Sequence, residues 1–178
     1  MKRIMTIMTA LVVASAMCFT AIGEFSFASE QQAIGADKAK SIALSNAKLS
    51  TGKVRGMECD YDDEDGVYEI EFTKKKNRAE YDYEIHAFSG KILKKCVDYK
   101  YKAKRSNKKI GKKKAIKKVA KYSKISAKTI KKGTCKFKYK KRGSKYEIKF
   151  RKGDYKYEAE VLARNGKVIE WEYEYIGR

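Results

Sequence analysis

The sequence contains a single histidine and no proline among its 178 residues. A lone histidine makes up neither a zinc ligand set nor a catalytic triad. The position of His86 in an alternating pattern predicts an exposed side chain beside Asp82 and Glu84. Without proline, no loop gains the stiffness that its ring provides. Histidine-based enzyme sites are therefore not expected.

The common catalytic and nucleotide-binding motifs are also missing. The chain has no HExxH, no GxSxG, no P-loop and no GxGxxG followed by a helix. Carboxylates occur in pairs on the predicted strands, such as Glu69 with Glu71 and Glu158 with Glu160. Each pair lies on a solvated face, where no burial is evident to separate the two pKa values for acid–base work. The sequence predicts a protein that is not an enzyme and holds no cofactor or metal.

The acidic run over residues 60–66 invites comparison with a calcium-binding loop. An EF-hand loop needs glycine at position 6 and glutamate at position 12. Counted from Asp60, position 6 is Asp65, and position 12 is Glu71 in the next predicted strand. Because the spacing fails, the run is predicted to be a hairpin turn with acidic side chains.

Residues 1–28 have the pattern of a signal peptide. Residues 1–3 are positively charged, residues 4–18 are mostly apolar, and residues 26–28 suit signal peptidase, so cleavage is predicted after Ala28. The apolar stretch is short for a membrane span, which needs about 20 residues. An uncleaved signal anchor is the alternative. The mature protein is expected to be secreted or to stay in the extracytoplasmic envelope.

Three cysteines remain after that cleavage, and an odd number allows one disulfide at most. The alternation predicts that Cys59 and Cys135 point into cores as small apolar side chains. Cys96 has the opposite phase from Val97 and is expected to face solvent. A bridge between Cys59 and Cys96 would have to cross the sheet, which disulfide geometry forbids. The fold is therefore expected not to depend on disulfides.

The chain repeats itself with a period of about 76 residues. Two strand motifs slip by two residues in opposite directions, and the slips fall in turns and cancel. This pattern indicates a duplicated small domain. It predicts a short segment over 29–33, a first repeat over 34–99, a linker over 100–109 and a second repeat over 110–178. The matched anchors are Ile34-Gly35 with Ile110-Gly111, Lys38-Ala39 with Lys114-Ala115, Cys59 with Cys135, and Gly90-Lys91-Ile92 with Gly166-Lys167-Val168.

Each repeat is predicted to be one helix followed by four antiparallel strands, an α+β fold. Apolar residues at helical spacing mark one helix near residues 39–47 and another near 115–123. The strands alternate between apolar and charged residues, as expected for a sheet with one buried face. Asn165-Gly166 is a strong hairpin signal. In the second repeat the predicted inward residues are Cys135, Phe137, Tyr139, Tyr146, Ile148, Phe150, Tyr155, Tyr157, Ala159, Val161, Ile169, Trp171, Tyr173 and Tyr175.

The net charge of +21 comes from the second half of the chain. Residues 34–99 carry 12 basic and 13 acidic side chains, whereas residues 100–178 carry 29 basic and 7 acidic ones. Lysine acts as a point charge, so this composition predicts diffuse attraction to a polyanion rather than recognition of one phosphate. The candidate polyanion-binding residues are Lys112, Lys113, Lys117, Lys118, Lys121, Lys136, Lys138 and Lys140.

Two other interpretations of the lysines are weaker. Residues 108–121 resemble a membrane-surface helix, but an amphipathic helix packed on its own sheet explains the pattern, because the equivalent first helix carries far fewer lysines. Aromatic residues alternate with lysine over 136–140, as in surfaces that stack on nucleic-acid bases. Because the alternation turns those aromatics inward, nucleic acid is not expected as a partner.

The strand motifs resemble the PepSY domain. The first repeat has Tyr68-Glu69-Ile70-Glu71-Phe72, Tyr81-Asp82-Tyr83-Glu84-Ile85 and Ser89-Gly90-Lys91-Ile92, and the second repeat has a more lysine-rich version. The resemblance implies an exported, non-catalytic protein that modulates a secreted or cell-surface peptidase. The alternative, from the charge asymmetry, is docking of the second repeat on an anionic cell-wall polymer or anionic lipid.

Overall fold

The computed structural model describes residues 32–177. The predicted signal peptide lies outside these residues. Within 32–177, no helix is both long and apolar enough to cross a membrane. The elements, in chain order, are α1 (Ala36–Ala47), the 3-10 helix η1 (Thr51–Lys53), β1 (Val54–Asp62), β2 (Val67–Lys74), β3 (Glu80–His86), β4 (Ile92–Asp98), α2 (Lys112–Ser123), α3 (Ala127–Lys131), β5 (Thr134–Lys138), β6 (Lys145–Lys152), β7 (Tyr155–Leu162) and β8 (Val168–Tyr175).

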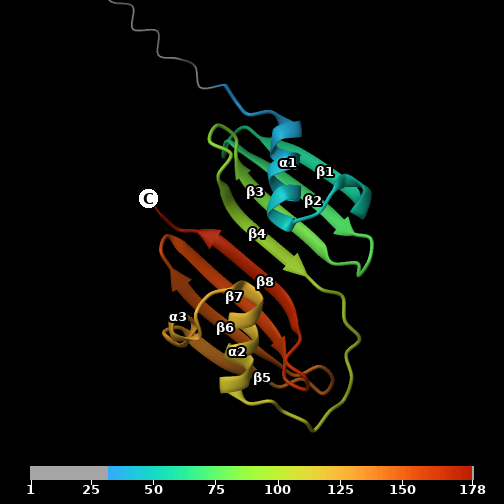
Figure 1. The fold of residues 1–178 in the computed structure, drawn as a ribbon, viewed down its shortest axis with the longest axis vertical. Coiled ribbons are helices and arrows are strands. Elements are labelled where there is room, and N and C mark those ends of the chain that lie inside the picture. Colours follow the sequence, from blue (N-terminus) through green and yellow to red (C-terminus); the bar gives the residue numbers. More distant parts are fainter. Residues whose placement is uncertain (1–31, 178) are drawn as a thin grey trace, which may run out of the picture. The chain divides into compact units, whose positions relative to one another are not determined.

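The strands form one antiparallel sheet in the order β1-β2-β3-β4-β8-β7-β6-β5 (Figure 1). The predicted α+β class is confirmed. The four strands of each half do not form a separate sheet, because β4 pairs with β8 at the middle and joins the halves. This pairing satisfies the backbone groups of two strands that would otherwise be exposed edges.

The register of β4 against β8 centres on one pair of residues. Cys96 lies opposite Glu172, and Lys94 lies opposite Glu174. Cys96 and Glu172 are also separated by the predicted repeat period of 76 residues. The pairing therefore brings together two positions that the predicted repeat treats as equivalent.

Both longer helices cover the same face of the sheet, α1 over the first half and α2 over the second (Figure 1). Each covers its own cluster of buried side chains, as expected for sheets packed on one side. The first cluster centres on Ile70 and Ile85 and the second on Ile148 and Val161, all 0% exposed. The predicted alternation is confirmed in β2, where Ile70 is buried between exposed Glu69 and exposed Glu71.

Three expectations need correction. Tyr139 was expected to point inward but is 79% exposed, because β5 ends at Lys138 and the alternation ends with it. The second half has an additional helix, α3, in which the Ser126 hydroxyl accepts a hydrogen bond from the Thr129 amide and Ile130 is buried. Cys96 lies on the face opposite the helices, as expected, but neighbouring strands half-bury it. Burial, aided by Asp82 and Glu170, raises the pKa of its thiol to about 12.

The other two cysteines follow the sequence pattern. Cys59 packs against the first core cluster and Cys135 against the second. Within the described residues, Cys59, Cys96 and Cys135 are all free thiols.

Candidate functional site

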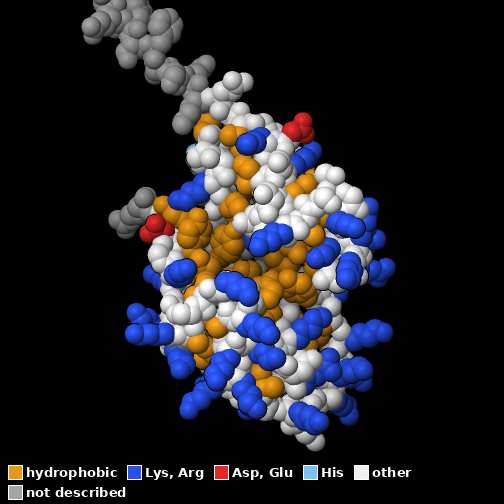
Figure 2. All heavy atoms as spheres, viewed as in Figure 1, with side chains coloured by type: hydrophobic (Ala, Val, Ile, Leu, Met, Phe, Trp, Pro, Cys, Tyr) orange, Lys and Arg blue, Asp and Glu red, His pale blue; other side chains and the backbone are white. Residues whose placement is uncertain are grey.

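A groove of about 760 Å³ lies between α1 and α2, above the central strands β4 and β8. Figure 2 shows hydrophobic side chains gathered at the middle of this face, surrounded by Lys and Arg. The groove exists because the two helices sit over separate halves of the sheet and leave its central strands uncovered (Figure 1). Its lining residues are Ile42, Asn46, Lys48, Gly90, Ile92, Lys95, Tyr122, Ser123, Ile125, Lys152, Tyr155, Tyr157, Trp171 and Tyr173.

Aromatic side chains build the side of the groove that belongs to the second half. Trp171 on β8 has its ring centroid 5.6 Å from that of Tyr122 on α2 and 5.5 Å from that of Tyr157 on β7. The Tyr122 hydroxyl lies 2.7 Å from the Tyr99 hydroxyl, at the end of β4. Edge-to-face and tilted contacts of this kind stabilise packed aromatic groups. Tyr122 and Trp171 thus form a rigid apolar wall.

The first half contributes a cation to the same groove. Lys95 on β4 has the same phase as the buried Val97, so its side chain runs over the helix-covered face. Its ammonium donates a hydrogen bond of 2.7 Å to the Asn46 side-chain oxygen on α1 and lies 5.2 Å from the centroid of the Tyr83 ring. No carboxylate of residues 32–177 forms an ion pair with it. Burial lowers the pKa of Lys95 to about 8.

The predicted repeat relates residues on the two sides of the groove. Asn46 and Tyr122 are separated by the repeat period, and so are Lys95 and Trp171. The first half therefore places a polar residue over a lysine, and the second half places an aromatic residue over a tryptophan. The side of the first half carries Lys48 and Lys95, and the side of the second half is mainly aromatic, with Lys152 at the end of β6.

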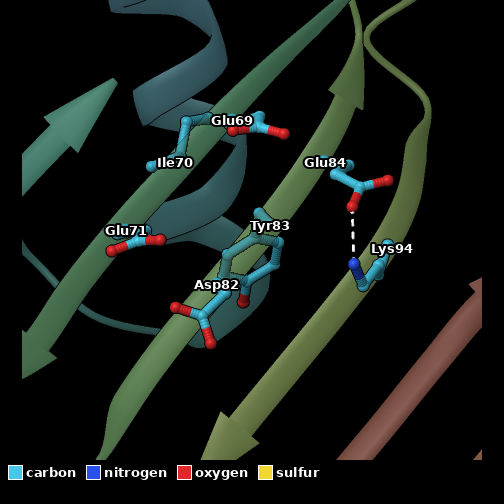
Figure 3. Close-up of a pocket in the computed structure, with 7 residues that line it drawn as sticks. All are labelled: Glu69, Ile70, Glu71, Asp82, Tyr83, Glu84 and Lys94. Atoms are coloured by element: carbon cyan, nitrogen blue, oxygen red, sulfur yellow. Dashed lines mark hydrogen bonds and ion pairs between the residues drawn. The ribbon is translucent and has the colours of Figure 1, made fainter. Parts of the chain in front are cut away.

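On the open face of the sheet, carboxylates gather over the first half. Figure 3 shows Glu69, Glu71, Asp82 and Glu84 together on β2 and β3, around a hollow of about 130 Å³. Lys94 forms an ion pair of 2.7 Å with Glu84. Burial, and then the charge of Glu71, raises the pKa of Asp82. Among residues 32–177, no group of three or more His, Cys, Asp or Glu side chains is arranged to hold a metal ion.

The structure divides the predicted polyanion-binding lysines between different surfaces. Those on α2 lie on its exposed side, while Ala115, Ile116 and Val119 face the sheet. This arrangement agrees with an amphipathic helix packed on its own sheet. Lys136 and Lys138 alternate with core-packed Cys135 and Phe137, so they point to the opposite face of β5. The eight lysines therefore do not all lie on one face of the sheet.

Within the predicted set, Lys138 and Lys140 have further neighbours. Lys138 lies 3.7 Å from Glu147, within ion-pair distance. Lys140 lines a small hollow beside Lys104 and Arg164. Lys140 therefore belongs to a separate basic group near the end of β5.

The remaining candidate residues have structural surroundings. The Asp62 carboxylate accepts hydrogen bonds from the Glu64 and Asp65 amides, so the acidic run is the predicted hairpin turn between β1 and β2. His86 ends β3, and its Nδ1 lies 3.0 Å from the Ser89 hydroxyl in the following turn. It is partly buried rather than fully exposed.

The sequence interpretation did not identify the groove. One signal was present, since Lys95 has the phase of the buried Val97. A second signal was the presence of Trp171 at the position that the predicted repeat makes equivalent to Lys95. Neither signal shows that the two sides face each other, because that depends on the pairing of β4 with β8.

Comparison with known proteins finds a family match in the first half. Residues 33–95 match the family model PepSY, described as the peptidase propeptide and YPEB domain. Uncharacterized protein Spy1430 of Streptococcus pyogenes serotype M6 is 43% identical over 72 residues, which cover 39% of this chain and 54% of that protein. The chain thus spans about half the length of this curated relative.

Solved structures give more distant similarities. The Bacillus megaterium YpeB C-terminal domain aligns with a TM-score of 0.46 at 17% identity, over 79% of this chain and 63% of that one. A DUF2874 family protein from Bacteroides uniformis aligns with a TM-score of 0.28 at 12% identity, over 74% of this chain and 84% of that one.

Proposed function

We propose that the chain is an exported, non-enzymatic binding protein that modulates a secreted or cell-surface peptidase. The observation that carries this proposal is the match of residues 33–95 to the peptidase propeptide and YPEB domain. The groove supports it, because concave sites with apolar walls and a few placed polar groups are where binding proteins hold their ligands.

An activity assay with purified residues 29–178 tests the proposal. The chain is added to secreted and envelope peptidases of the organism that encodes it, and hydrolysis of labelled casein is followed. A rate that changes with the dose of folded chain, and not with heat-unfolded chain, supports modulation. Unchanged rates for every peptidase fraction contradict it.

We also propose that residues 110–178 form a second copy of the domain. Backbone angles at equivalent positions support this, with φ of 81° at Gly35 and 78° at Gly111, and 56° at Lys48 and 62° at Lys124. The latter pair ends α1 and α2 in the same left-handed cap. An experimental structure in which the second half has a different order of helix and strands would contradict the duplication.

A second candidate function is docking on an anionic polymer or lipid through α2. The observation that favours it is that the ion pairs of the described residues include no lysine of α2. Exposed charges are screened over about 10 Å at 0.1 M salt. Binding to phosphatidylglycerol vesicles should therefore fall steeply between about 0.05 and 0.5 M NaCl. Retention that does not change with salt would contradict this function.

A further inference from the structure

We infer that the groove between α1 and α2 is the surface that contacts the partner, and that it takes an apolar polypeptide segment whose carboxylate pairs with Lys95. This inference deepens the proposed function and rests on it. The carboxylate is that of an Asp or Glu side chain or of a C-terminus.

The lining of the groove is complementary in charge to a carboxylate. The residues that line the groove include Lys48, Lys95 and Lys152 and no Asp or Glu. Lys95 is the half-buried one, and its hydrogen-bond partner is the neutral Asn46 amide. A partly desolvated cation without a counter-ion is unfavourable, so a carboxylate brought by a ligand gains a charge-assisted hydrogen bond there.

The rest of the lining offers apolar surface at a few positions. Ile42 and Ile92 are partly exposed, whereas Ile125 and Trp171 are only 7% and 6% exposed. A volume of about 760 Å³ has room for several side chains. Ile42, Ile92 and the 36% exposed Tyr122 therefore give the groove an apolar strip for an apolar side chain, next to the lysines that suit a carboxylate.

The positions of the lining residues give the segment an orientation. Lys95 and Asn46 lie on the side of the first half, and Tyr122 and Trp171 lie on the side of the second half. A segment that crosses the groove therefore places its carboxylate toward α1 and its apolar side chain toward α2. The exposed part of Tyr122 supplies apolar area and Lys95 supplies specificity, as in other sites with few polar anchors.

Trp171 provides the measurement, because it is the only tryptophan of the chain. The probes are N-acetyl-Leu-Phe-Glu-Leu-amide and the same peptide with Gln in place of Glu, titrated while Trp171 fluorescence is recorded. We expect the Glu peptide to bind at least about 10-fold more tightly, the gain from one charge-assisted pair. Equal affinities, or no response to the Glu peptide up to about 1 mM, would overturn the inference.

Variants assign the preference to Lys95. Lys95→Met should abolish the preference for Glu and leave the fold intact, since an apolar side chain of similar length replaces a desolvated charge. Lys95→Arg should retain most of the preference. Lys76→Met, in the exposed turn after β2, is the matched control and should change nothing. An undiminished preference in Lys95→Met, with an unchanged circular dichroism spectrum, refutes the assignment.

The pH dependence is a further readout. Affinity for the Glu peptide should decline as pH rises through about 8, where burial places the pKa of Lys95. Tyrosines face this lysine from the neighbouring elements, and burial raises the pKa of Tyr81 and of Tyr173 to about 12, so they stay neutral. The groups near Lys95 are Tyr81 and Tyr83 on β3, Tyr173 on β8, Tyr122 and Asn46 on the helices, and the rim residues Lys48 and Lys152.

The same variants separate this inference from the proposed function. If wild type and Lys95→Met slow a peptidase equally, the modulator function stands and the groove inference fails. If the Glu peptide binds through Lys95 but every peptidase is unaffected, the groove is a peptide site and the modulator function fails. If polyphosphate displaces the Glu peptide and Lys95→Met abolishes polyphosphate binding, the ligand is a polyanion and the polypeptide assignment is overturned.

Discussion

Replacement of Glu170 by glutamine should stabilise the fold at pH 8 and leave its stability unchanged near pH 4. Glu170 on β8 lies directly opposite Asp98 on β4 and opposite Glu160 on β7. Like charges that face each other across strands are destabilising. Lys145 pairs with Glu160, which leaves Glu170 without an ion pair among the described residues.

The size and sign of the effect follow from this arrangement. Burial, and then the charge of Glu160, raises the pKa of Glu170 from its usual 4.5 to about 7. Because folding raises the pKa of this carboxyl, its protonated form favours the folded state. This contribution to stability is fully present below the unfolded pKa of 4.5 and is lost as pH rises through about 7. Each pKa unit corresponds to about 1.4 kcal/mol. Because Glu170 is only half-buried, solvent screening reduces the destabilisation by its ionised carboxylate to about 1 kcal/mol.

Thermal unfolding of residues 29–178, followed by circular dichroism, measures this effect. For a chain of this length, about 1 kcal/mol raises the Tm of Glu170→Gln by roughly 2–4 °C at pH 8. At pH 4 both states hold a protonated carboxyl, so the variant and wild type should unfold together. Glu64→Gln, in the exposed β1–β2 turn, is the control and should have no effect at either pH. An equal Tm change at both pH values, or destabilisation at pH 8, would refute the reasoning.

Three further predictions concern packing, turn geometry and thiol chemistry. Ile70→Ala and Ile148→Ala, each at a position with 0% exposure, should each lower the free energy of unfolding in urea by about 2–5 kcal/mol, and a value below about 1 kcal/mol would contradict the assigned cores. Gly166→Ala should cost at least about 1 kcal/mol, because its φ is +75° and a Cβ would lie 2.9 Å from the Lys118 Cγ, whereas Gly52→Ala, in open space, should be neutral in the same urea experiment. With its pKa near 12, the Cys96 thiol should react with Ellman's reagent at pH 8 at least about 100-fold more slowly in the native chain than in urea, and equal rates would show that it is not shielded.

Local patterns in the sequence were sufficient to predict the type of fold and most of the buried residues. In β2 the alternation of Tyr68, Ile70 and Phe72 with glutamates indicates one buried face, and the structure buries those three. The phase of each cysteine relative to its neighbours also predicted the face on which it lies. Such predictions succeed because side chains of a strand alternate between faces whatever the strand pairs with.

Local patterns failed where an element is short or ends early. The five-residue helix α3 is too short to show a helical period, and Tyr139 continues an alternation beyond the end of β5. The exposure of Cys96 was also overestimated, because the side chains of neighbouring strands determine how much of it is covered.

The candidate site depended on tertiary structure. The sequence by itself determined that Lys95 has the phase of Val97 and that Trp171 lies one predicted repeat period further along the chain. Only the pairing of β4 with β8 placed these two residues in the same groove, since that pairing depends on contacts between strands that are distant in the chain. The pairing also joins two sheets into one, with the groove on its helix-covered face and the acidic patch of β2 and β3 on its open face.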